Sequence, residues 1–294
     1  MRNMSKLTIN IGLPASGKST ESEKKILSDG NTVRINKDLL RTMLHFDKFT
    51  GKNEGLTRDA SRVLAKFYLT NSTNVIIDDT NLNPSTKQSW VDLAKECDAK
   101  IEYLDMTHVS VNECIDRDSK REKRVGKHVI QKMALQYLEY MKGEKVVICD
   151  LDGTLCDIEH RRHFVAQTPK DWKGFFEAMT DDTAREEVVK LLRQFQKERK
   201  KIIFVSARPE TYRSITEWWL DVKVGSPIEK TPYEMLIMRE ANDKRPDTEV
   251  KSDIYDKYLK NLNITSVIDD RPSVIRMWRG KGSDVIDVGN GEEF

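Results

Sequence analysis

Two aspartates follow a short apolar run near the middle of the chain, in the stretch Val146-Val-Ile-Cys-Asp150-Leu-Asp152-Gly-Thr154. The apolar run is typical of a strand buried in a parallel sheet, and ligands bind where such strands end. Beside a divalent cation, Asp150 is suited to take up a phosphoryl group as an aspartyl-phosphate, and Asp152 to supply and recover the proton. The alternative is an ordinary acidic turn, which a lone Asp-x-Asp favours and the whole string does not.

A second pattern follows the apolar run 7–11 and fits G-x-x-x-x-G-K-[ST]. Its glycines let successive backbone N–H groups turn around phosphate oxygens, and the helix that follows presents its positive N-terminus to the same anion. The sequence therefore predicts a nucleotide phosphate site. Its expected residues are Gly12, Ser16, Gly17 and Lys18, with Ser19 as a magnesium ligand and Thr20 beside it.

Asp38 follows the strand-like run 32–35 and opens a helical stretch. At that sheet edge Asp38 could accept the proton of an attacking hydroxyl, while Arg41, about one helical turn on, grips an acceptor phosphate. The alternative reading makes Asp38 only a helix N-cap.

Two further groups complete this first set of candidates. Asp79 and Thr80 end the apolar run 74–77, where Asp79 could orient the reacting groups; the alternative is that this turn is merely capped. Arg117 and Arg121, four residues apart in a basic stretch, are expected to share a helical face and to cover the transferring phosphate as a lid. The alternative there is a solvated charged face.

Polar residues also end two apolar runs after Asp152. Ser206 is expected to bind the phosphate oxygens that are not transferred, and Arg208 to bind the substrate beside it. Asp269 is expected to complete a magnesium shell with Asp150 and Asp152, and Asp270 to support it. The segment 156–182 could form a small cap, whose basic residues meet an anionic substrate or lie on the surface; these are His160, Arg161, Arg162 and His163.

The order of apolar runs and helical stretches predicts an α/β protein of two domains, 1–142 and 143–294, each with a mostly parallel sheet flanked by helices. The helical spacing of the apolar residues over 56–68 predicts a packing helix that buries Leu56, Val63 and Phe67, among others. Lys plus Arg (50) nearly balance Asp plus Glu (48), so net charge selects no class of partner.

The four cysteines, at 97, 114, 149 and 156, show no paired spacing, so we expect neither a zinc site nor a disulfide framework. No apolar run approaches the roughly 20 residues that span a bilayer, and no signal-peptide core precedes the first strand. We therefore expect a soluble cytoplasmic protein without membrane partners, in the host cytoplasm if the protein is viral.

These motifs carry a family resemblance. The stretch 145–155 resembles the first motif of the haloacid dehalogenase phosphatases. From about residue 7 onward, the order of motifs resembles the T-even bacteriophage type of polynucleotide 5′-kinase/3′-phosphatase. The resemblance implies Asp38 as the general base on a 5′-hydroxyl and Arg121 on the donor phosphates. It also implies Lys251 beside the phosphorylated aspartate, because the spacing from Arg239, a further substrate-binding candidate, matches that family. Ala207 stands where the family has glycine, a mild departure.

The resemblance implies a bifunctional enzyme that uses ATP and Mg²⁺ to phosphorylate 5′-hydroxyl ends of RNA or DNA and hydrolyses 3′-phosphate ends. Its expected partners are nucleotide and polynucleotide ends, and a homo-oligomer stays open. One alternative is a nucleoside or small-metabolite kinase fused to a small-molecule phosphatase. Another is a nucleotide-sensing adaptor, although an adaptor has no use for a nucleophile.

Overall fold

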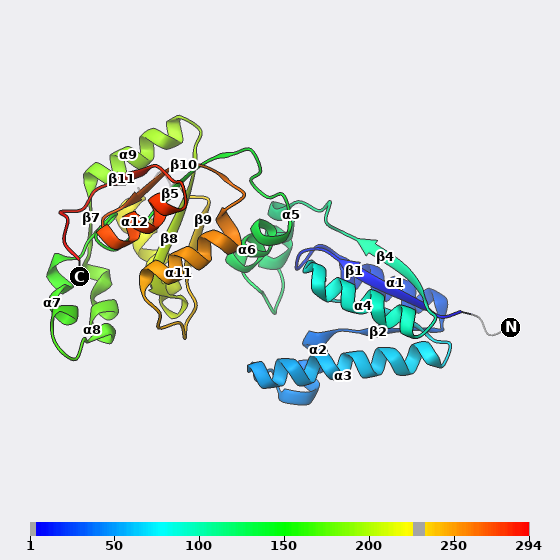
Figure 1. Cartoon of the computed structure of the whole chain (residues 1–294). Coiled ribbons are helices and arrows are strands. Elements are labelled where there is room, and N and C mark those ends of the chain that lie inside the picture. The colour runs from blue at the N-terminus through cyan, green and yellow to red at the C-terminus, as the bar shows by residue number, and fades with distance from the viewer. Residues whose placement is uncertain (1–3, 226–232, 294) are drawn as a thin grey trace. The chain divides into compact units, whose positions relative to one another are not determined.

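The computed structural model describes residues 4–225 and 233–293, and it divides into two compact units, residues 1–138 and 139–294 (Figure 1). The division lies a few residues before the expected boundary at 142, because helix α6 (Lys127–Tyr137) ends there in extended backbone at Leu138. Both units contain parallel sheets with flanking helices, so the predicted α/β class is confirmed.

The first unit is built on a four-stranded parallel sheet in the order β2-β3-β1-β4. Its buried core combines Leu7, Ile9, Val75 and Ile77 of the central strands with Trp90, Leu93 and Ala94 of α4. Because all four strands run the same way, the loops after β1, β2 and β3 gather at one sheet edge. The elements are β1 (Lys6–Ile11), α1 (Lys18–Asp29), β2 (Thr32–Ile35), α2 (Lys37–His45), α3 (Gly51–Thr70), β3 (Asn74–Ile77), α4 (Pro84–Glu96), β4 (Lys100–Asp105), α5 (Val111–Ser119) and α6.

Helix α3 differs from its predicted packing. The predicted core residues Leu56, Val63 and Phe67 are exposed, and the buried face carries Thr57, Ser61, Ala65 and Leu69 instead. These mostly small side chains allow α3 to lie close to its neighbours, which leaves the larger apolar side chains on the outer face.

The second unit has a five-stranded parallel sheet in the order β11-β10-β5-β8-β9. The register pairs Cys149 of β5 with Phe204 of β8 and with Ile268 of β10, so the residues after these strands meet at one edge. The sheet and its helices are β5 (Lys145–Cys149), α9 (Glu186–Lys197), β8 (Lys201–Pro209), α10 (Arg213–Trp219), the π-helical turn Leu220–Val224, β9 (Met235–Arg239), α11 (Asp247–Ile254), the π-helical turn Tyr255–Leu259, β10 (Asn263–Asp269), α12 (Pro272–Gly280) and β11 (Val285–Asp287).

The segment that follows the Asp-x-Asp stretch folds as a small helical insertion. A short antiparallel pair, β6 (Cys156–Asp157) and β7 (Thr183–Ala184), closes its base. Phe175 is buried in its core, while Phe176 contacts both Trp172 and Tyr212 with ring centroids 6.0 and 5.1 Å apart. The insertion contains α7 (His163–Ala166), α8 (Trp172–Glu177) and the 3₁₀ turns Glu159–Arg161 and Ala178–Asp181. Across the described parts of both units, no helix combines the length and the apolar character that crossing a membrane requires.

Candidate active sites

The end of β5 places Asp150 against a lysine and a second aspartate. The Asp150 backbone N–H donates to the Ile268 carbonyl at 3.0 Å, which fixes it beside the end of β10. Lys251, on the buried side of α11, holds its Nζ 2.7 Å from Asp150 Oδ1 and 2.9 Å from Asp269 Oδ2. Burial opposes the lysine charge, but the two carboxylates outweigh it and hold the pKa of Lys251 above its usual value. A cation is thus present where a phosphoryl group on Asp150 would carry charge.

Three carboxylates at this edge are close enough to share one metal ion. Oxygens of Asp150, Asp269 and Asp270 lie within 4.8 Å of one another. Carboxylate oxygens are the ligands that Mg²⁺ prefers, so the donor set fits that ion. Asp270 is oriented by the Thr154 hydroxyl, which donates to it at 2.7 Å. The carboxylate of Asp270, which we expected only to support the metal, lies in this group, whereas that of Asp152 lies in a second group; the expected ligand role of Asp152 stays a prediction.

Asp152 instead lies in a buried group with two arginines. Arg208 donates to both of its carboxylate oxygens, with Nη2 2.6 Å from Oδ1, and Arg161 Nη2 lies 2.5 Å from the same Oδ1. Asp182 balances the arginine charges, with its oxygens 2.6 Å from Arg161 and 3.1 Å from Arg208. Burial alone would raise the pKa of Asp152, but the two guanidinium groups hold it well below its usual range.

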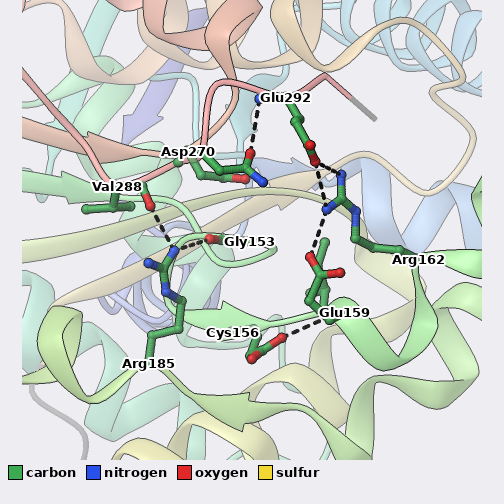
Figure 2. A pocket seen from close by; sticks show the side chains of 12 residues that line it. Gly153, Cys156, Glu159, Arg162, Arg185, Asp270, Val288 and Glu292 are labelled. Carbon is green, nitrogen blue, oxygen red and sulfur yellow. Dashed lines mark hydrogen bonds and ion pairs between the residues drawn. The ribbon is translucent and has the colours of Figure 1, made fainter.

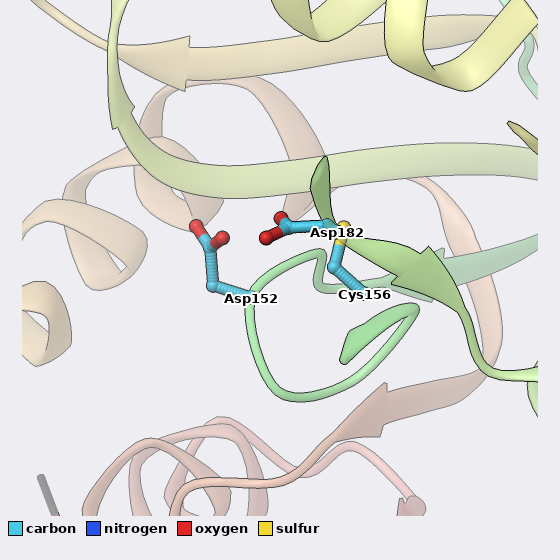
Figure 3. A group of neighbouring side chains, drawn as sticks. All are labelled: Asp152, Cys156 and Asp182. Atoms are coloured by element: carbon cyan, nitrogen blue, oxygen red, sulfur yellow. The ribbon is translucent and has the colours of Figure 1, made fainter. Parts of the chain in front are cut away.

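Figure 3 shows Asp152 and Asp182 turned toward each other, with Cys156 beside them. The three could in principle hold a metal ion. The Arg208 Nη2, however, lies 2.6 Å from Asp152, 3.1 Å from Asp182 and 3.3 Å from the Cys156 sulfur. The guanidinium group of Arg208 therefore contacts all three of these side chains.

Two arginines that we expected at the substrate have other contacts. The side chain of Arg208 is completely buried and binds Asp152. Arg239 donates to the carbonyls of Ala207 at 2.7 Å and Arg245 at 2.6 Å and pairs with Asp247 at the start of α11. Arg239 thereby shapes the loop that leads to α11, the helix that carries Lys251. Arg208 holds Asp152, so neither arginine projects into an open site.

Ser206 lies where it was expected, in β8 next to the end of β5. Its hydroxyl is buried and accepts a hydrogen bond from the Arg208 N–H at 3.1 Å. The serine therefore helps to shape the turn that directs Arg208 to Asp152.

A cavity of about 350 Å³ opens beside the Asp-x-Asp-Gly-Thr loop (Figure 2). Arg185 ties that loop to the end of the last strand, because its Nη1 donates to the carbonyls of Gly153 at 2.7 Å and Val288 at 3.0 Å. Arg162, across the cavity, pairs with Glu159 at 2.8 Å and with Glu292 at 3.4 Å. The Asp-x-Asp-Gly-Thr loop thus borders a space lined by basic and acidic side chains.

In the first unit, the loop after β1 has the geometry that its motif predicts. Gly12 has φ 150° and Gly17 has φ 104°, backbone conformations that favour glycine, and a Cβ on Gly12 would also lie 2.9 Å from the Ser16 Oγ. Lys18 folds over this loop, with Nζ 2.9 Å from the Gly12 carbonyl oxygen and 3.2 Å from Ser16 Oγ. Burial lowers the pKa of Lys18 to about 8. Ser19, together with Thr20, is exposed at the start of α1, which leaves its hydroxyl accessible to a ligand.

Helix α2 presents Asp38 to solvent. The N-cap is Asn36, whose side chain accepts from the Leu39 N–H at 3.0 Å, so the alternative that Asp38 is the cap is wrong. Asp38 is 80% exposed and lies 2.7 Å from Arg41 Nη1. Arg41 also forms a two-pronged pair with Glu54 of α3, in which Nη2 lies 2.8 Å from Oε2. Glu54 therefore fixes the direction of the arginine.

Asp79 and Thr80 link the end of β3 to the two neighbouring loops. Asp79 accepts from the Lys37 backbone N–H at 3.0 Å, and burial raises the pKa of its carboxyl group. Thr80 takes part through its carbonyl, which accepts from the Gly12 N–H at 3.0 Å. Asn81 clamps the turn by donating to the Asn10 carbonyl at 2.8 Å. Asp79 thus lies between the phosphate loop and α2, and Thr80 braces the phosphate loop.

The expected arginine lid is a helix followed by a loop. Helix α5 ends at Ser119, so Arg117 and Arg121 do not share one helical face as predicted. Arg117 Nη1 donates to the Ser16 carbonyl at 3.1 Å and thus contacts the phosphate loop. Arg121 is half-exposed in the loop, which the buried Asp118 holds by accepting the N–H groups of Val125 and Gly126 at 3.2 and 2.9 Å.

Comparison with known proteins agrees with the division into two units. Residues 144–293 match the family model described as the polynucleotide kinase PNKP phosphatase domain, and residues 7–142 match that of an AAA domain. The chain belongs to this polynucleotide kinase phosphatase family. The predicted resemblance is therefore confirmed.

Two similar proteins are named for two activities, one of which is that of a polynucleotide kinase. A protein of Autographa californica nuclear polyhedrosis virus, named as a bifunctional polynucleotide kinase/RNA ligase, is 25% identical over 93% of this chain and 41% of its own length. A bifunctional polynucleotide phosphatase/kinase of Schizosaccharomyces pombe is 30% identical over 33% of the chain and 20% of its own length. This chain thus spans well under two thirds of these relatives. The solved Pnkp1/Rnl/Hen1 complex contains a chain that is 27% identical, with 100% of this chain and 99% of that one covered and a TM-score of 0.43.

Sequence reasoning about this phosphatase-family chain missed three contributions. We gave Arg161 to a substrate, and it binds Asp152; Asp182 and Glu54 were not considered at all. The burial of Arg161 has no local signal, because it depends on where the insertion folds. An acidic residue one helix away from Arg41 could have been noticed, but nothing in its spacing selects Glu54 among the other acids.

Proposed function

We propose that this chain heals nucleic-acid ends by two reactions, phosphorylation of 5′-hydroxyl ends with ATP and hydrolysis of 3′-phosphate ends. The observation that carries the proposal is the pairing of Asp150 with Lys251 at 2.7 Å in one unit, while the other unit holds both a phosphate loop after β1 and the pair Asp38–Arg41 at the start of α2. The names of the related proteins support polynucleotide ends as the substrate class.

We assign the kinase reaction to residues 1–142. The loop Gly12–Gly17 and Lys18 bind the ATP phosphates, and Ser19 is placed to hold the accompanying Mg²⁺. Asp38 accepts the proton of the 5′-hydroxyl as its oxygen attacks the γ-phosphorus and the bond to the β-phosphate oxygen breaks. Arg41 binds the acceptor phosphate, while Arg117 and Arg121 carry positive charge to the donor phosphates.

We assign the phosphatase reaction to residues 143–294. A carboxylate oxygen of Asp150 attacks the phosphorus of the 3′-phosphate, the bond from phosphorus to the 3′-oxygen breaks, and that oxygen takes a proton from Asp152. Water then attacks the aspartyl-phosphate and gives its proton to Asp152, which releases phosphate and restores both residues. Lys251 offsets the negative charge, and Ser206 offers a hydroxyl to the phosphate oxygens.

Two features of the phosphatase unit suit this chemistry. Arg161 and Arg208 hold Asp152 as a carboxylate before substrate binds. Asp152 therefore takes up a proton together with the substrate, delivers it to the leaving 3′-oxygen, and returns to the carboxylate when the proton that it takes from water passes to solvent. Mg²⁺ fits the carboxylates of Asp150, Asp269 and Asp270, and when bound it would reduce the repulsion between them and a phosphate dianion.

The wider setting of the enzyme is part of the proposal. The baculovirus relative is named for an RNA ligase as well as a kinase, and the Pnkp1 structure is described as an RNA repair complex with Rnl and Hen1. A ligase that seals the healed ends is therefore the partner that we propose first, with the enzyme acting in the cytoplasm. The proposal includes DNA ends as substrates, which the assay below tests beside RNA. It also includes a homo-oligomer, whose test is the oligomeric state in sedimentation.

An oligonucleotide with a 5′-hydroxyl and a 3′-phosphate tests the proposal directly, as RNA and as DNA, with and without ATP. We expect 3′-phosphate release in Mg²⁺ without ATP and 5′ phosphorylation only with ATP. The free 3′-mononucleotide serves as the comparison. Higher kcat/KM for the mononucleotide in both reactions would instead support a small-molecule kinase fused to a phosphatase.

A further inference from the structure

The connection between α2 and α3 carries apolar side chains that the fold leaves in solvent. Phe46 is 91% exposed and Phe49 is 74% exposed, and Met43 and Leu39 precede them on the outer face of α2. We call Phe46 and Phe49 the aromatic corner. Contiguous exposed apolar surface on a protein commonly marks a binding site, whereas single exposed residues do not.

The backbone holds the aromatic corner in a defined shape. Phe46 has φ 49° and its N–H donates to the Thr42 carbonyl at 3.0 Å, which ends α2. The Lys48 N–H donates to the His45 carbonyl at 2.9 Å, and Thr50 caps α3 by accepting from the Asn53 N–H at 3.1 Å. The two rings therefore project from an ordered turn. Figure 1 shows the two helices, α2 and α3, that this turn connects.

The aromatic corner lies between two groups of kinase candidates. The Phe49 ring centroid is 5.5 Å from the guanidinium carbon of Arg41, the expected acceptor-phosphate ligand. On its other side, Asp47 pairs at 3.3 Å with Lys123, in the loop that also carries Arg121. The rings are thus continuous with the surface on which an acceptor strand would reach Asp38.

We propose that the aromatic corner stacks on the nucleobases next to the 5′-hydroxyl end of a single-stranded acceptor. This inference rests on the kinase reaction proposed above and adds how a polynucleotide is told from a smaller acceptor. Stacking on aromatic rings is the sequence-tolerant way in which proteins bind single strands, and it is accompanied by cations along the backbone. Lys48 and Lys52 lie beside Phe49 in the sequence, and Lys123 pairs with Asp47, so exposed cations that suit a phosphate backbone accompany the aromatic corner.

The test compares Phe46→Ala, Phe49→Ala and the double variant with Phe67→Ala. Phe67 is a matched control because it is 59% exposed on α3 but about 24 Å along that helix from its first residue, Gly51. Loss of one stacked base weakens binding about 5- to 150-fold. We expect each corner variant to raise KM for a 5′-hydroxyl oligonucleotide by a factor in that range, and by much less for a nucleoside 3′-monophosphate. Phe67→Ala should keep the wild-type values.

A binding measurement separates this inference from the proposed function. An oligonucleotide with 2-aminopurine as its second base should lose fluorescence on stacking against wild-type protein, and the double variant should abolish that quenching. Quenching without kinase turnover would contradict the proposed kinase function but support the stacking site. Equal quenching in wild type and double variant would overturn the inference. The inference would also be overturned if wild type sediments as a dimer, the double variant sediments as a monomer, and both quench the fluorescence equally. The rings would then bind a second copy of the chain.

Discussion

Replacing Asp182 by Asn isolates the buried charge group around Asp152. Asp182 is completely buried and accepts from Arg161 at 2.6 Å, Arg208 at 3.1 Å and His160 at 2.9 Å. The two arginines and two aspartates balance, so the substitution leaves one uncompensated positive charge in the interior. Breaking a buried ion pair in this way costs about 3–5 kcal/mol.

For a unit the size of residues 139–294, that loss corresponds to a fall of about 6–20 °C in the unfolding midpoint. We also expect the 3′-phosphatase rate to drop about 10- to 100-fold at temperatures where the variant stays folded, because Arg161 and Arg208 no longer hold Asp152 as firmly. Differential scanning calorimetry and a 3′-phosphate release assay measure the two effects.

The neighbouring Asp181 provides the matched control, because it is exposed. Asp181→Asn should leave the midpoint within about 2 °C and the rate close to wild type. If Asp182→Asn behaves like Asp181→Asn, the buried charge group does not hold Asp152, and our account of that residue fails.

Three further outcomes follow from other contacts. Gly289→Ala should abolish 3′-phosphate release, since the added Cβ would lie 2.0 Å from the Asp270 carbonyl oxygen; an unchanged Mg²⁺ titration of the activity would contradict this. Because Lys18 has a pKa lowered to about 8 and phosphate binds its charged form, ATP binding must take up a proton above that pH. The dissociation constant for ATP in calorimetry should therefore rise toward tenfold per pH unit above about pH 8, and a flat profile would refute the assignment. Glu54→Gln should loosen Arg41 and raise KM for the 5′-hydroxyl acceptor roughly tenfold with KM for ATP unchanged, whereas equal changes in both would point to a general loss of structure.

Local motifs explain why much of both sites could be predicted. The phosphate loop and the Asp150 stretch each combine a strand, a turn and the reactive residues within about ten positions. The local sequence therefore determines the geometry of each motif. Parallel strands then bring Asp150 and Asp269 to one edge, as expected. Lys251 required the family resemblance, because a single lysine on a helix has no distinguishing pattern of its own.

The remaining contacts depend on chain segments that meet only in the fold. Arg208 was expected at the substrate because it ends a strand, but the insertion brings Arg161 and Asp182 against the same carboxylate and closes that side. Sequence patterns do not show which of several arginines an insertion will bury. The same limit applies to α3, where small residues such as Ser61 face the core and Phe67 does not.

The central claim is that one chain carries two independent phosphoryl-transfer sites. The most direct measurement follows both ends of a single 5′-hydroxyl, 3′-phosphate oligonucleotide in Asp38→Ala and Asp150→Asn variants whose folding is verified by calorimetry. We predict that Asp38→Ala loses 5′ phosphorylation and keeps 3′-phosphate release, and that Asp150→Asn shows the reverse. Loss of both activities in either folded variant would contradict the account.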